Sequence, residues 1–332
     1  MQSESNRINQ KRLFNSILNF RELNLIIIII AIAAFLWIFT DSFSSTNNLR
    51  SVGVSFAINC IVVIAMALVI ISGGIDLSVG SVMALSSCLF AVLYLDGNPF
   101  ILCVLAAIGA SLACGLFNGF LIAKQKMPPF IVTLAMLGIA RGICLIITTG
   151  TPLSLVDKLP PAFRFLGGGS FQGIPVLLII SVVLVVIADT LFRKSPLLRQ
   201  VYYTGSNQKA AEFSGINVDK VKILVYVFSA LLCGLAGLLF VSRYSFASPV
   251  AGQGLELTVI AGCVIGGISM EGGEGTVLGA VLGVILLSVI NNGLILLDVS
   301  VYWQQFISGI ILISAVWLDY SRISRRNKKL NA

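Results

Sequence analysis

The chain has 332 residues, of which 57% are hydrophobic and only 11% charged, and its formal net charge is +8. Soluble domains carry about 25% charged residues, so this composition excludes a soluble globular protein. Residues 25–39, LIIIIIAIAAFLWIF, form an unbroken apolar run, which excludes the alternating strands of a membrane β-barrel. Because backbone groups in lipid must bond to one another, the sequence predicts an all-α polytopic membrane protein.

The amino-terminal segment is polar up to the first apolar run. We expect residues 1–23 to form a cytoplasmic arm and no cleavable signal peptide, because the apolar run is too long and no small-residue cleavage site follows it. The arm either lies on the membrane as an amphipathic helix or is a solvated flank of the first span.

About ten transmembrane helices are predicted from apolar runs long enough to cross a bilayer. They cover residues 24–40, 50–72, 78–95, 99–123, 129–148, 174–192, 222–242, 254–270, 277–296 and 302–319. The transmembrane domain therefore extends over 24–320, and a basic tail follows at 321–332. With ten spans, four basic clusters, at 7–21, 124–126, 193–222 and 322–329, fall on one side. Positive residues favour the cytoplasmic side, so both termini are expected there.

The longest loop on the opposite side covers residues 150–173. Pro160, Pro161 and the glycines 167–169 predict an irregular, non-helical segment. It is either a passive connection or a lid or partner-docking surface.

Two glycine-rich breaks interrupt the apolar pattern, at residues 73–81 and 266–276. The first is either a tight turn or a re-entrant break, and it contains Asp76 and Ser78. We expect Asp76 to cap the next helix by accepting backbone N–H bonds, with a role in a conduction path as the alternative. The second break weakly resembles the first, as an internal repeat would, and lies on the same predicted side.

Polar residues within the spans are candidates for interhelical hydrogen bonds, and a minority for a polar pathway. Amides both donate and accept, which suits neutral, hydroxyl-rich solutes. The candidates for the pathway or for polar structure are Asp76, Ser78, Asn118, Glu256, Asn291 and Asn292; Asn59, Thr133, Arg141, Gln304 and Gln305 also fall within or beside spans.

Seven cysteines lie within apolar runs without a CxxC pair, and the chain has no histidine and no P-loop motif. The cysteines are therefore interpreted as packing residues, and no metal or cofactor site is expected on this chain. The basic charge is interpreted as a topology signal, so no nucleic-acid partner is expected.

A polar, basic segment at residues 203–218, YTGSNQKAAEFSGINV, separates two apolar halves. Residues 208–213 predict a short helix with Asn207 or Ser206 as its cap, and Gly215 as its stop. Such a helix fits a groove of another protein; a surface helix without a partner is the alternative.

Five motifs together resemble the permease subunit of bacterial ATP-binding-cassette (ABC) importers for monosaccharides of the ribose, galactose and xylose type. They are SGGIDLSVGS at 72–81, PFIVTLAMLGIARG at 129–142, GSNQKAAEFSGINVDKVKI at 205–223, GLELTVIAGCVIGGISMEGGEGTVLGAVLG at 254–283 and INNGLILLDVSVYWQQFISG at 290–309. The similarity extends over about residues 25–320.

This resemblance implies a type II-like ABC importer fold in a bacterial inner membrane. It further implies a second permease subunit, identical or different, two cytoplasmic ATPase subunits that carry ATP and Mg²⁺, and a periplasmic sugar-binding protein. Coupling to the ATPase is then expected at Gly205, Ser206, Asn207, Ala210, Ala211, Ser214, Gly215 and Ile216. Two departures from the family pattern are Glu274, where a basic residue is frequent, and Ser206, where a second glycine is usual.

Two other classes remain open at this point. An ion-coupled secondary transporter or a channel would use buried carboxylates such as Asp76 or Glu256. A membrane-embedded enzyme would need a nucleophile–base pair or a metal cluster. The sequence leaves the solute open among ribose, galactose, xylose, allose and a sugar-like signalling molecule.

Overall fold

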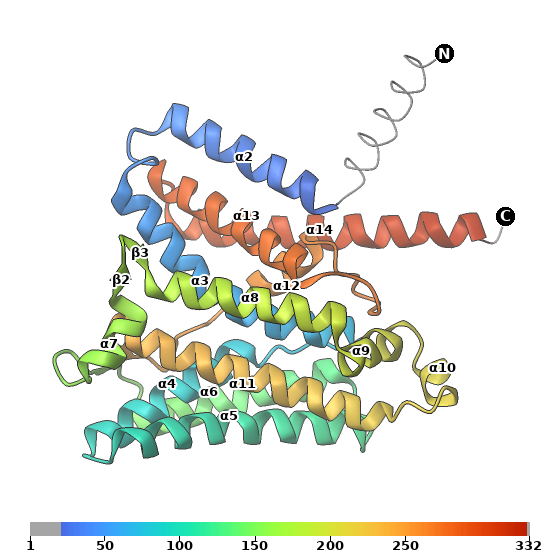
Figure 1. Ribbon diagram of the computed structural model, residues 1–332, viewed down its shortest axis with the longest axis horizontal. Helices are drawn as coiled ribbons and strands as arrows, with labels where there is room; N and C mark the ends of the chain where they lie inside the picture. Colours follow the sequence, from blue (N-terminus) through green and yellow to red (C-terminus); the bar gives the residue numbers. More distant parts are fainter. Residues whose placement is uncertain (1–20, 331–332) are drawn as a thin grey trace.

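The computed structural model describes residues 21–330, which form a mostly helical bundle (Figure 1). The long helices are α2 (Arg21–Phe39), α3 (Thr46–Ile71), α4 (Val79–Leu95), α5 (Phe100–Ala123), α6 (Pro129–Thr148), α8 (Val176–Lys194), α11 (Val218–Tyr244), α13 (Val277–Leu296) and α14 (Val301–Leu330). Shorter helices are α7 (Pro161–Gly168), α9 (Pro196–Ser206), α10 (Gln208–Phe213) and α12 (Leu255–Ile265). Two-residue strands pair as β1 (Leu153–Ser154) with β4 (Phe246–Ala247), and β2 (Ser170–Phe171) with β3 (Ile174–Pro175), both antiparallel.

Every predicted apolar run contains a helix, but the count of ten spans is not confirmed. Within residues 21–330, seven helices can cross a membrane by length and composition: α2, α3, α5, α6, α8, α11 and α13. Helix α4 has 17 residues, and α12 has only 11. The predicted span 254–270 is therefore too long, because Gly254 at φ +79° precedes the helix and Gly267 at φ +90° follows its last turn.

Helix α3 lies at the centre of the bundle, and almost all of its side chains from residue 57 to 71 are buried. Helix α11 packs against α3, α4 and α5. On α5, a methyl group added to Gly115 would lie 2.5 Å from the Tyr226 carbonyl oxygen, and one on Gly119 would lie 2.9 Å from the Ile223 Cα. These small residues thus let α5 and α11 approach closely.

The loop at 150–173 is not irregular throughout, so the prediction of a non-helical segment was wrong. Helix α7 occupies Pro161–Gly168, with Pro161 in its first turn. Proline suits this position because its missing N–H would have no partner in the first turn. The loop is also held in place by strand pairing, through β1 to β4 and by the β2–β3 hairpin.

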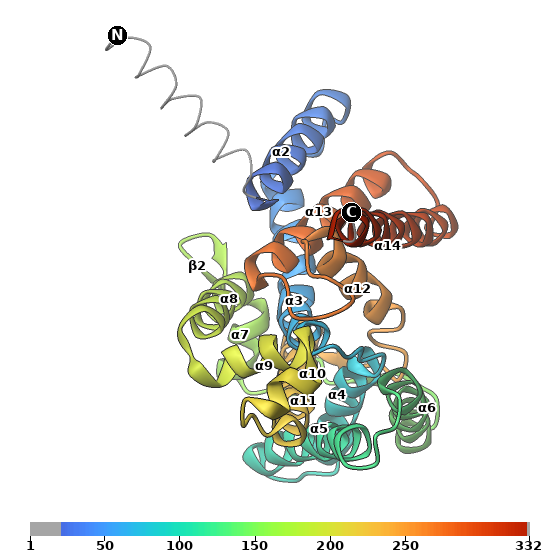
Figure 2. The same cartoon turned by 90° about the vertical axis from the view of Figure 1, so that its right-hand side faces the viewer.

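The two ends of the bundle carry different structures (Figures 1 and 2). Helix α7 and the β2–β3 hairpin lie at one end, whereas α9 and α10 lie at the other. At the second end, Asp219 at the start of α11 pairs with Lys124 at 3.1 Å and Lys126 at 2.6 Å, both from the connection between α5 and α6.

The two predicted terminal segments are only partly described. Residues 21–23 of the predicted arm belong to α2, and residues 1–20 lie outside the described part of the chain. Helix α14 continues from the last predicted span into the basic tail as far as Leu330.

Candidate functional site: a coupling segment and a polar cavity

The segment predicted as a coupling helix forms α10, with the predicted ends. The Asn207 side chain accepts a hydrogen bond from the Ala210 N–H at 3.0 Å and so caps the helix. Gly215 follows at φ +82°, and its N–H donates to Glu212 O at 3.0 Å. A left-handed residue at this point ends an α-helix and favours glycine. Sequence reasoning therefore located both the helix and its caps correctly.

The two alanines of α10 face different surroundings. Ala211 is only 3% exposed, so it packs mainly inside the protein, although it belongs to the residues expected to couple to the ATPase. Ala210 is exposed. It lines a shallow hollow of about 370 Å³ together with Tyr203, Ser206, Asn207, Ala211, Ser214 and Ile216.

Phe213 is the side chain on α10 that the sequence analysis missed. It is 92% exposed at the last residue of the helix. The next residue, Ser214, lines the hollow, so this end of the molecule offers both an apolar projection and a depression. Aromatic residues of this kind often anchor protein interfaces.

The two glycine-rich breaks come together beside this segment. Gly73 lies at φ +82° and Gly267 at φ +90°, each just after the end of a helix, α3 or α12. Their N–H groups donate to Ile70 O and Val264 O, both at 2.9 Å. The two breaks therefore end their helices in the same way. However, the left-handed glycine is the first of the pair 73–74 in one break and the second of the pair 266–267 in the other. The GGI alignment seen in the sequence is thus out of register by one residue.

Asp76 is buried at the first break and forms the centre of a hydrogen-bonded network. Its Oδ1 accepts from the Ser78 N–H at 2.9 Å and the Ser78 hydroxyl at 2.5 Å, and its Oδ2 accepts from the Ser229 hydroxyl at 3.1 Å. Asn118 donates to Ser78 Oγ at 3.2 Å. Asp76 thus bonds the N–H of the residue that precedes α4, close to the predicted capping role, and ties this turn to α11 through Ser229. The bond from Asn118 to Ser78 ties the same turn to α5.

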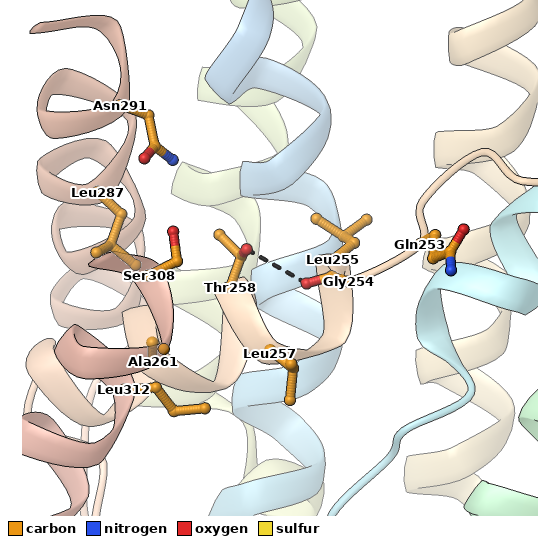
Figure 3. A pocket seen from close by; sticks show the side chains of 11 residues that line it. Gln253, Gly254, Leu255, Leu257, Thr258, Ala261, Leu287, Asn291, Ser308 and Leu312 are labelled. Atoms are coloured by element: carbon orange, nitrogen blue, oxygen red, sulfur yellow. Dashed lines mark hydrogen bonds between the residues drawn. The ribbon is translucent and has the colours of Figure 1, made fainter. Parts of the chain in front are cut away.

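A cavity of about 760 Å³ opens where α12, α13 and α14 meet (Figure 3). Its lining combines amide and hydroxyl side chains with small and aliphatic residues: Gln253, Gly254, Leu255, Leu257, Thr258, Ala261, Leu287, Asn291, Ser308, Gly309 and Leu312. None of these side chains is charged. Pockets of about 300–1,000 Å³ with a few polar groups are typical binding sites for small molecules.

Helix α12 reaches only part of the way across a bilayer. Its 11 residues correspond to about 16 Å, roughly half of a hydrocarbon core of about 30 Å. The chain before it, residues 248–254, is non-helical. Irregular backbone at membrane depth is tolerated only where it is buried in protein or lines a water-filled cavity.

Arg141 on α6 holds this non-helical segment. Its guanidinium Nη1 donates to Pro249 O and also to Ala251 O, the latter at 2.8 Å. On the other side, a methyl group on Gly80 of α4 would overlap Gly252 O. The segment that leads to the cavity residues Gln253 and Gly254 is therefore fixed by α4 and α6.

The remaining sequence candidates are dispersed. Asn292 forms a reciprocal amide pair with Asn48, at 2.8 and 3.1 Å, and so joins α13 to α3. The half-buried Glu256 carboxylate lies near Gly80. Of the six pathway candidates only Asn291 lines the cavity, whereas Gln253, Thr258 and Ser308 were missed.

Two further candidates have structural bonds. The Thr133 hydroxyl donates to Pro129 O at 2.9 Å, and Gln304 donates to Val299 O at 3.0 Å. Asn59 is half-buried on α3, and the Gln305 side chain lies outside the described part of the structure.

Over residues 21–330, no group of three or more His, Cys, Asp or Glu side chains is placed to hold a metal ion. All seven cysteines are free and buried. The expectation that ATP and Mg²⁺ bind a partner and not this chain stays a prediction.

The helices of the described residues that are long and apolar enough to cross a bilayer define the class of the chain as a multi-pass membrane protein. Residues 48–316 match the family model described as the branched-chain amino acid transport system / permease component. The chain belongs to this family of ABC importer permeases.

Its relatives include permeases named for sugars. The chain is 39% identical to the ribose import permease protein RbsC of Bacillus subtilis (strain 168), over 96% of this chain and 97% of the relative. It is 36% identical to the RbsC protein of Escherichia coli (strain K12), over 89% and 91%. It is 33% identical to the xylose transport system permease protein XylH of Haemophilus influenzae (strain ATCC 51907 / DSM 11121 / KW20 / Rd), over 90% and 95%. No solved structure matches the chain.

Proposed function

We propose that this chain forms half of the membrane pathway of an ATP-driven importer for a monosaccharide or a similar small, hydroxyl-rich solute. The observation that carries this proposal is the uncharged polar cavity at α12, α13 and α14. Its amides and hydroxyls can both donate to and accept from sugar hydroxyls. The relatives named for ribose and xylose import support a sugar over a branched-chain amino acid, whose charged ends would be matched better by charged groups.

The power source in this proposal is a separate cytoplasmic ATPase subunit that carries ATP and Mg²⁺ and docks on α9 and α10. Phe213 and the hollow would form the contact, with Ser206, Asn207, Ala210, Ser214, Gly215 and Ile216 around them. Gly205, from the predicted coupling set, would lie behind this surface, against the backbone of Ile71 and Gly273. Ala211 supports this surface from inside. A second permease, either another copy or a related chain, would complete the pathway, and a periplasmic binding protein would deliver the solute to the end that carries α7.

An ion-coupled transporter is the competing function, and the cavity argues against it. Such transporters place ionisable side chains along the ion path, whereas the described lining residues of the cavity are all uncharged. Asp76 is fully engaged with Ser78 and Ser229 and does not line the cavity.

Uptake by the reconstituted complex tests the proposed function. The permease, its ATPase and its binding protein in proteoliposomes are expected to accumulate labelled D-ribose or D-xylose only when ATP is present on the ATPase side. A proton or sodium gradient without ATP should drive no uptake. Gradient-driven uptake, or ATP-driven uptake of leucine with neither pentose transported, would overturn the proposal.

The proposed topology has ten crossings of an inner membrane, one of them made by residues 248–254 together with the half-length α12. It places both termini and α10 in the cytoplasm. In a cysteine-free background, Ser154→Cys on β1 is expected to react with a membrane-impermeant maleimide added from outside. Lys209→Cys on α10 should react only after the membrane is permeabilised. Both side chains are exposed on the protein surface, so a difference in labelling reports the side of the membrane and not burial within the protein. The opposite labelling pattern would contradict this topology.

A further inference from the structure

Three segments that are distant in sequence meet backbone to backbone beside α10. They are the end of α3 at Ile71 and Gly73, the end of α9 at Gly205, and the second break at Gly272 and Gly273. The Gly273 N–H donates to Ile71 O at 2.9 Å. A methyl group on Gly205 would overlap Ile71 O and lie 2.7 Å from the Gly273 nitrogen.

The other glycines of this junction are equally close to one another. A methyl group on Gly272 would lie 2.9 Å from the Gly73 Cα, and one on Gly273 would lie 2.6 Å from the Ser206 Cα. No side chain separates the three backbones, so no rotamer change can absorb a displacement. Close-packed protein transmits such a displacement to its neighbours.

A side chain provides a second link from α9 to the second break. The Tyr202 hydroxyl donates to Gly275 O at 3.0 Å. Burial raises the pKa of Tyr202, and the nearby Asp189 carboxylate adds to this shift, so the hydroxyl stays protonated as a donor. Tyr202 and Gly205 lie in the last two turns of α9, and α10 begins at Gln208. The contacts of Tyr202 and Gly205 therefore lie between α10 and the helix bundle.

The breaks are joined directly to the helices around the cavity. The second break connects α12 to α13. Thr258 on α12 and Leu287 and Asn291 on α13 line the cavity. The first break connects α3 to α4, and α4 in turn packs against the segment before α12 through Gly80 and Gly252. A movement of α9 thus has two routes to the same cavity.

We propose that Gly205 and Tyr202 act as the relay that converts movement of α10 into movement of both breaks, and so links ATP hydrolysis to opening of the cavity. The relay rests on the proposed coupling function but is separate from the docking surface itself. Gly205 and Tyr202 are positioning residues, because they act on the cavity through the breaks.

The test measures solute molecules transported per ATP hydrolysed by the full complex with its binding protein, using labelled D-ribose or D-xylose. We expect Gly205→Ala to keep the ATPase bound and hydrolysing but to lower this ratio at least about fivefold, the size of a typical coupling between sites. Tyr202→Phe, which keeps the ring and loses only the hydroxyl, should lower it by a smaller factor. Gly109→Ala on α5, where an added methyl group meets nothing within 4 Å, is the matched control and should not change it.

The outcomes separate the relay from the docking surface. If Gly205→Ala loses the ATPase on co-purification, Gly205 shapes the docking surface and the relay is wrong. If Gly205→Ala fails to fold, Tyr202→Phe decides, and a wild-type ratio in that variant overturns the relay. If Ala210→Trp in the hollow impairs coupling while Gly205→Ala and Tyr202→Phe keep the wild-type ratio, only the relay fails. If Ala210→Trp is also normal, the coupling function itself is wrong.

Discussion

Ala210→Trp is expected to lower co-purification of the ATPase subunit at least about tenfold, which corresponds to about 1.4 kcal/mol of binding free energy. The indole would fill the hollow of about 370 Å³ that Ala210 lines, so a partner surface seated there would be displaced. The fold should survive, because Ala210 is exposed and α10 is a short helix at one end of the bundle. The measurement is pull-down of the ATPase with the tagged permease, together with ATP-driven uptake in proteoliposomes.

A tryptophan placed elsewhere separates this local effect from a general one. Ser154→Trp is the control, because Ser154 is exposed on β1 beyond the far end of α11. It should bind the ATPase normally. Phe213→Ala provides an independent test: removing an aromatic anchor should also weaken binding. Normal ATPase binding and normal uptake in both Ala210→Trp and Phe213→Ala would contradict docking on α10.

Arg141→Met is expected to reduce ATP-driven uptake at least about tenfold while leaving ATPase binding unchanged. The substitution keeps an unbranched side chain but removes the donors to Pro249 O and Ala251 O. Hydrogen bonds from charged groups contribute about 1.5–3 kcal/mol each, so the segment before α12 would lose its main attachment to α6. The cavity residues Gln253 and Gly254 would then no longer be held in place. Uptake and pull-down on the same preparation measure the two quantities.

A second arginine in the chain offers a closely matched control. Arg50 also donates twice to backbone, through Nε at 3.2 Å and Nη2 at 3.0 Å, but to the single carbonyl of Gly173 at the β2–β3 turn. Arg50→Met should transport at close to the wild-type rate. Arg141→Lys keeps one strong donor and should recover part of the lost uptake. An Arg141→Met variant that transports normally would show that the segment before α12 is held by other contacts.

The sequence predicted correctly those helices and helix ends that depend on residues close to one another in the chain. Asn207 and Gly215 bracket α10 because a cap and a left-handed stop act within a few residues. The apolar runs predicted helices throughout, since lipid requires internal backbone bonding. Local signals were misread at α7. Pro161 and the following glycines suggested a loop, although proline in a first turn starts a helix as readily as it ends one.

The sequence by itself determined a polytopic helical membrane protein, its family motifs and a short capped helix at residues 208–213, because hydropathy, capping and turn residues are properties of neighbours in the chain. Only the tertiary structure decided that α12 is a half-length helix beside a cavity, that Asn291 lines this cavity while Asn292 pairs with Asn48, and that Ala211 is buried. It also decided that Gly73, Gly205 and Gly272 meet at one point. Each of these depends on packing between segments separated by tens to hundreds of residues, and no pattern within a single segment records which face meets which neighbour.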